Sequence, residues 1–153
     1  MSKALDNAEL IRTRFLTAPA VGEIATSVDL TTLTDFIIVD RQKNILPTVK
    51  LAVAKAQGTA ISILWMGGKV ADENARTPRI EHLYRVTVWS KPIIAGTELP
   101  ADDVVESCIN RLWHWKPGTG GHAFGEAKPG NVGMVPDKSF LIYDFEVLIP
   151  ISH

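Results

Sequence analysis

Two acidic residues near the end of the chain, Asp144 and Glu146, stand two positions apart, on one predicted strand face. Paired carboxylates hold metal ions in nucleases and supply the acid and base of hydrolases. A nuclease strand of that type normally adds a lysine two residues beyond the second acid, where this chain has Leu148. We interpret the pair as the solvated or partner-facing side of a strand, opposite Arg79 or Arg85 of a neighbouring strand.

The other reactive side chains are four histidines and one cysteine, none at a metal-ligand spacing. His82 shares the apolar face of a predicted strand and is expected in the core or at an interface, while a chance metal site between His114 and His122 stays an alternative. Cys108 lies on the apolar stripe of a predicted helix, where a thiol packs like a small hydrophobic side chain. The sequence therefore predicts no catalytic residue, no metal and no cofactor.

The glycine-rich run 118–125 invites comparison with a phosphate-binding loop. It lacks the Gly-Lys-Ser/Thr ending of a P-loop, and it follows a predicted helix instead of joining a strand to one. Without a helix N-terminus, a phosphate would lose both the free N–H groups and the helix dipole. We interpret the run as a surface connector.

Composition narrows the function classes. The 153 residues are 46% hydrophobic and 22% charged, and 16 basic against 17 acidic residues leave a net charge of −1. This balance gives no basic surface for nucleic acid, and the longest apolar runs, such as 36–39, are far too short to span a bilayer. A single cysteine fits a reducing compartment, and the N-terminus has no signal-peptide pattern. We expect a cytosolic domain.

Hydrophobic periodicity predicts helices and strands in a definite order. Helices are expected over 4–17, over 45–56 with Gly58 at its end, and over 101–115. Strands are expected over 60–66, which Gly67-Gly68 would end, over 79–89, and over 139–149. Residues 122–128 predict a short strand that Pro129-Gly130-Asn131 would end. The run 36–39 fits a strand or a buried helix, and 20–34 predicts no element.

These elements predict one α+β domain over residues 1–153. The strands at 60–66 and 79–89 should pair as an antiparallel hairpin. The whole sheet is expected to be antiparallel, with a mixed sheet possible, and to have about four strands with two to three helices packed on one face. Long connectors are expected at about 69–78 and 116–138.

The four tryptophans lie near the ends of predicted elements. Aromatic side chains left partly outside a small core are enriched at protein interfaces. We expect at least one of them at an interface; the alternative is that they cover the sheet edge of their own chain.

Three segments together resemble a small virion protein of long-tailed bacteriophages, the tail terminator (tail-completion) class or a close neck relative. They are the amphipathic N-terminal helix, the strand 84–90 followed by the helix start at 99–106, and the closing strand 140–147. The resemblance implies a ring, expected to be a hexamer, that caps the head-proximal end of the tail tube, stops tube growth and docks a head-completion (neck) protein. It implies a place in the virion tail or neck, host cytoplasm during assembly, and no catalysis, membrane or sequence-specific nucleic acid.

In such a ring the edge strands and long connectors would make the contacts, and charged residues would set register and partner choice. The residues expected at the interfaces are Trp65, Arg76, Arg79, Glu81, Trp89, Trp113, Trp115, Phe124 and Asp144.

Two alternatives stay open. One is a small cytosolic α+β enzyme or ligand-binding domain that uses a polar cluster of Asp144, Glu146, His122 and Arg85. The other is an oligomeric adaptor unrelated to phages.

Overall fold

A computed structural model describes residues 3–33, 37–40, 59–72, 79–90, 100–117, 125–136 and 141–152 of the chain. In chain order its elements are helix α1 (Lys3–Phe15), the 3-10 turn η1 (Leu30–Leu33), strands β1 (Ile37–Asp40), β2 (Thr59–Asp72) and β3 (Arg79–Ser90), helix α3 (Ala101–Leu112), and strands β4 (Lys128–Pro136) and β5 (Leu141–Ser152). The predicted α+β class is confirmed.

The five strands form one sheet in the order β1-β2-β3-β5-β4. The neighbours β2, β3, β5 and β4 are antiparallel, and β1 pairs with β2 in parallel, so the sheet is mixed. The predicted hairpin between 60–66 and 79–89 is confirmed. The run 36–39, which the sequence left undecided, falls largely on strand β1.

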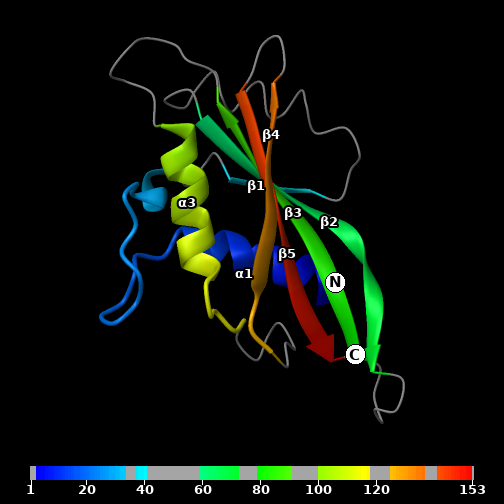
Figure 1. Cartoon of the computed structure of the whole chain (residues 1–153). Helices are drawn as coiled ribbons and strands as arrows, with labels where there is room; N and C mark the ends of the chain where they lie inside the picture. Colours follow the sequence, from blue (N-terminus) through cyan, green and yellow to red (C-terminus); the bar gives the residue numbers. More distant parts are fainter. Residues whose placement is uncertain are drawn as a thin grey trace.

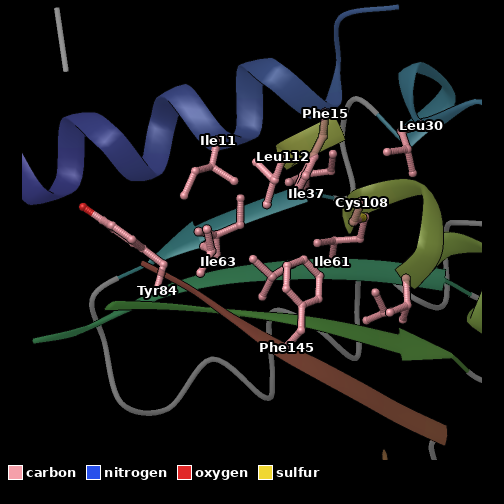
Figure 2. Packing of buried hydrophobic residues seen from close by; sticks show 14 of the residues in the cluster. Ile11, Phe15, Leu30, Ile37, Ile61, Ile63, Tyr84, Cys108, Leu112 and Phe145 are labelled. Carbon is pink, nitrogen blue, oxygen red and sulfur yellow. The ribbon is translucent and has the colours of Figure 1, made fainter. Parts of the chain in front are cut away.

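Helices α1 and α3 lie on the same side of the sheet, which they cover in Figure 1. The two helices contact each other, and α1 lies over β1 and β2 while α3 lies over β3 and β5. Alternate residues of the strands fill the space beneath them, as strand geometry requires. Figure 2 shows Ile11 and Phe15 of α1 and Leu112 of α3 above Ile61 and Phe145 of the sheet.

The sequence accounts directly for the two helices. In α1 the buried Ala8, Ile11 and Phe15 recur at spacings of three and four, which places them on one face. Helix α3 starts after Pro100, with Asp102 and Asp103 in a first turn whose free N–H groups favour negative charge.

The opposite face of the sheet carries a more polar pattern. Its rows run Leu64–Arg85–Glu146 and Ser62–Thr87–Asp144 across β2, β3 and β5. None of the described helices lies on this face. The strand face that carries Asp144 and Glu146 therefore lies on the side of the sheet away from α1 and α3.

Two strand ends were predicted wrongly. Gly67 and Gly68 do not end β2: Gly67 adopts φ 106°, the register shifts between Trp65 and Gly68, and pairing with β3 continues to Asp72. The glycines absorb a β-bulge, which a strand tolerates better than a break in its ladder. The first residues of the expected 69–78 connector are thus strand.

Strand β4 shows the same effect. It does not end at Pro129-Gly130-Asn131 but starts at Lys128 and runs to Pro136, inside the expected 116–138 connector. Asn131 takes a left-handed φ of 55°, and the register with β5 shifts between Gly130 and Gly133. A bulge again accommodates residues that usually end a strand.

The helix predicted over 45–56, the possible strand start at 122–124 and most of the glycine-rich connector lie outside the described residues. Within the described part of the chain, no helix is long and apolar enough to cross a membrane.

We predict that Phe145→Ala lowers the free energy of unfolding by about 3–5 kcal/mol, because Phe145 is fully buried between β5 and the helices. The control Met134→Ala, at a side chain 54% exposed on β4, should change it by less than about 0.5 kcal/mol. Urea unfolding followed by circular dichroism measures both. Similar small losses in the two variants would contradict this core assignment.

Candidate protein interface

Seven of the nine residues predicted at interfaces are described, and these seven do not form one cluster. They lie in the middle of β2, on the polar sheet face and after the C-terminal end of α3. The remaining two, Arg76 and Phe124, fall in ranges that the structure does not describe.

Trp65 lies in the middle of β2, just before the Gly67 bulge. Its side chain is 43% exposed, and its indole N–H donates a 2.9 Å hydrogen bond to Nδ1 of His82 on β3. His82 is buried, as the sequence predicted. Met66 and Val70 are also exposed on this stretch, so the end of β2 presents an apolar surface.

Trp89 lies on the polar face of the sheet and is partly buried. Its indole N–H donates a 2.9 Å hydrogen bond to the hydroxyl of Ser62 on the neighbouring β2 strand. This bond satisfies the polar end of the ring and lays the indole across the sheet. Trp89 thus fits the alternative in which a tryptophan covers its own chain.

The paired acids occupy the same face. Glu146 lies 3.7 Å from the guanidinium of Arg85 and accepts a 2.9 Å hydrogen bond from Nδ2 of Asn131. The predicted cross-strand pairing with Arg85 is confirmed. Asp144 lies opposite Thr87, and its carboxylate fits beside Gly133, where an added Cβ would come within 3.1 Å of it.

Arg79 and Glu81 lie at the start of β3. Arg79 stands opposite Asp72 of β2 and Ser152 of β5, and not beside the acids of the polar face. Glu81 stands opposite Lys69. Glu81 and Lys69 are thus residues of opposite charge at directly paired cross-strand positions.

Trp113 and His114 form the turn that ends α3. His114 adopts φ 54°, the left-handed conformation that closes many helices, and the chain reverses so that Ala127 N–H donates to Trp115 C=O at 2.7 Å. This bond brings 125–129 alongside 113–115. Between them lies a hollow of about 210 Å³, the Trp113 hollow, lined by Trp113, His114, Glu126, Ala127, Lys128 and Pro129.

Three polar residues that line the Trp113 hollow are exposed, and we call them its rim: His114, Glu126 and Lys128. His114 Nδ1 lies 2.8 Å from a carboxylate oxygen of Glu126, and both side chains are largely exposed. The Trp113 ring meets the His114 ring edge-on and is 51% exposed. An exposed aromatic ring inside a polar rim is the arrangement of an interface anchor.

Trp115 has a different role. It is partly buried against the core, and the Arg14 guanidinium lies 5.8 Å from the centre of its ring. That distance is within range of a cation–π interaction. Trp115 therefore helps to join α1 to the segment after α3, which is a role within the chain.

An ion network joins the C-terminal ends of the two helices, and we name it the Glu23 clamp. The Glu23 carboxylate pairs with Arg14 of α1 and, at 3.4 Å, with Arg111 of α3. Arg14 Nε also donates to the Arg111 C=O at 2.8 Å, and Arg111 Nη2 donates to the Arg14 C=O at 3.4 Å. Arg111 is buried, so Glu23 compensates a cation that has left water.

These contacts shift the pKa values of the clamp. The backbone N–H of Ala20, followed by Arg14, lowers the pKa of Glu23 from 4.5 to about 2. Burial lowers the pKa of Arg111. The sequence reasoning missed this network, although Glu23 is the lone charge in the stretch 16–28 and that isolation was a usable signal.

The remaining reactive groups lie in the fold and not in a cleft. Cys108 is fully buried in the core, and burial raises the pKa of its thiol, which agrees with the predicted packing role. Within the ranges that the structure describes, no three His, Cys, Asp or Glu side chains gather to hold a metal ion.

The chain matches no protein-family model, and no curated protein is significantly similar to it in sequence.

We predict that the hydrogen bond between Trp89 and Ser62 couples the two strands. A double-mutant cycle of Trp89→Phe and Ser62→Ala should give a coupling free energy of about 0.5–1.5 kcal/mol, the net worth of one hydrogen bond. Urea unfolding of the four proteins measures it. If the two single losses in unfolding free energy add up to the loss in the double variant, the bond contributes nothing to stability.

We also predict a pH-dependent contribution from Glu23. Since folding lowers its pKa from 4.5 to about 2, its stabilisation is complete above pH 4.5 and is lost as the pH falls toward 2. The difference in unfolding free energy between the wild type and Glu23→Gln should therefore shrink over that range. Urea unfolding at a series of pH values tests this, and a difference independent of pH would contradict it.

Proposed function

We propose that this chain is a structural virion subunit of the tail-terminator type. Several copies would form a ring, expected to be a hexamer, at the head-proximal end of a phage tail tube. The ring would stop tube growth and present its other face to a head-completion protein. The proposal includes no catalytic step.

One observation carries this proposal: large apolar side chains are exposed at several separated places on a small chain. They are Val21 and Ile24 after α1, Trp65, Met66 and Val70 on β2, Trp113 after α3, and Val132 and Met134 on β4. Single exposed apolar residues are ordinary, but groups of them on separate elements mark surfaces that other proteins cover. A ring subunit needs such surfaces toward its two neighbours in the ring, toward the tail tube and toward the head-completion protein.

The order of elements adds support. The three segments that resemble tail terminators correspond to α1, to β3 followed by α3, and to β5, and these pack on one another around a common core. The resemblance therefore falls on the framework of the domain.

The sheet edges favour contacts between side chains over addition of strands. Strand β1 has four residues, and β4 carries Pro129, Pro136 and a bulge. Short strands, prolines and bulges are the devices by which proteins prevent edge pairing. Copies would instead meet through loops and faces of the domain.

The alternative of an enzyme or ligand-binding domain rests on the polar row of the sheet. Arg85, Glu146 and Asn131 do lie together there, with Asp144 on the same face, while His122 is outside the described residues. The carboxylate of Glu146 already has two partners, which favours a structural role for the row.

The mass of the chain in solution tests the proposal. We expect a closed species near six times 16.7 kDa by light scattering, formed either alone or on the ends of tail tubes of the phage that encodes the chain. Electron microscopy should then show rings at tube ends and tubes that no longer lengthen. A monomer or dimer that is independent of concentration and ignores tubes would contradict the proposal.

A further inference from the structure

The loop that follows α1, residues 17–28, has an unusual composition for an exposed segment. Its only charged residue is Glu23, and that side chain turns inward to the clamp. The outward positions are small or apolar, with Val21 fully exposed and Ile24 46% exposed. Charged residues are depleted at the centres of protein interfaces, and this 17–28 loop has that character.

The loop is held in one shape at several points. Glu23 N–H donates to the Ala20 C=O at 3.1 Å across a turn in which Gly22 adopts φ 89°, and Glu23 Oε1 accepts from Ala20 N–H at 2.7 Å. At its far end, Val28 N–H donates to the Ser107 hydroxyl of α3 at 3.2 Å. The tip residue Val21 is thus presented on a preorganised turn, which reduces the ordering cost of binding.

The same chain carries an apolar recess of matching character. The Trp113 hollow has a volume of about 210 Å³, an exposed indole and a polar rim. One or two aliphatic side chains are the natural occupants of such a space. Val21 does not enter the hollow of its own chain, because its side chain is entirely exposed.

We propose that the 17–28 loop of one copy inserts Val21 and Ile24 into the Trp113 hollow of a second copy. This contact rests on the proposed ring function and names its interface between neighbours. The loop and the hollow are different surfaces, so the contact is heterologous when it is not reciprocal, and a heterologous contact can continue from copy to copy until a ring closes. Trp113 and Val21 would be the energetic centre, surrounded by weaker contacts that exclude water.

The second copy is favoured as occupant because the protrusion and the recess both lie on this chain. The loop follows the end of α1 and the hollow follows the end of α3. The Glu23 clamp joins these two helix ends, so it fixes the loop and the hollow relative to each other. The loop brings no free charge that would meet His114, Glu126 or Lys128 at the rim, and these can stay solvated around the apolar contact.

Sedimentation velocity over a range of concentrations tests the contact. Val21→Asp buries a carboxylate in an apolar recess and should raise the dissociation constant between copies at least about tenfold. Trp113→Ala should do the same from the other side. The control is Glu9→Lys, a charge change at an exposed residue of α1 that belongs to neither the loop nor the hollow, and it should leave the dissociation constant unchanged. Thermal unfolding checks that all three variants fold.

Mixing the two defective variants gives a sharper result. Val21→Asp retains an intact hollow and Trp113→Ala an intact loop, so the mixture should form a mixed dimer but no ring. Val21→Asp or Trp113→Ala proteins that assemble like the wild type, or a mixture that stays monomeric while the wild type assembles, would overturn the contact and leave the ring function standing. Self-association that depends on Val21 in a protein that ignores tail tubes would uphold the contact and overturn the tail function.

Discussion

The ion network between Glu23, Arg14 and Arg111 is the interaction on which the surface of this protein depends. Arg111 is buried at the end of α3, and a buried cation is strongly destabilising unless a carboxylate and hydrogen-bond acceptors compensate it. Glu23 supplies the carboxylate, and the Arg14 carbonyl accepts a hydrogen bond from Arg111. The Arg14 side chain in turn donates to the Arg111 carbonyl. The ends of α1 and α3 are therefore fixed relative to each other. The loop that carries Glu23 and the turn that carries Trp113 take their positions from that joint.

The sheet supplies the platform beneath. On its inner face the aliphatic and aromatic residues at alternate strand positions pack against the two helices. Burial of this apolar surface is the main source of stability. Its outer face carries polar rows in which Arg85, Glu146 and Asn131 bind one another. Bulges at Gly67 and near Asn131 bend the strands without ending them. The exposed side chains that can contact other proteins therefore lie after the helix ends and on the two bulged strands of this platform.

Much of this platform could be predicted from sequence because it repeats along the chain. The alternation in 79–89 and 139–149 and the helical spacing in 4–17 and 101–115 each indicate a face that must be buried, although α3 ends at Leu112. The bulges could not be predicted, because glycine or asparagine at positive φ occurs equally well at a strand end and in a bulge. The strand end predicted at Pro129-Gly130-Asn131 was wrong for that reason.

The candidate site was harder to predict, because it depends on residues far apart in the sequence. Glu23 meets Arg111 across 88 positions, and no local pattern reports such a pair. The tryptophans were identified as a class, but only the structure separates Trp89 and Trp115, which serve their own chain, from the exposed Trp113. The apolar character of residues 17–28 was visible in the sequence, yet its meaning depended on knowing that Glu23 points inward.

The most direct measurement is chemical cross-linking between single-cysteine surface variants, since the natural Cys108 is buried and does not compete. Protein with Val21→Cys is mixed with protein carrying Lys128→Cys at the rim of the hollow and treated with a short bismaleimide. The account predicts a covalent dimer joined through positions 21 and 128, well above the yield when Glu9→Cys, at an exposed position of α1, replaces Val21→Cys. Equal yields from the two mixtures would contradict it.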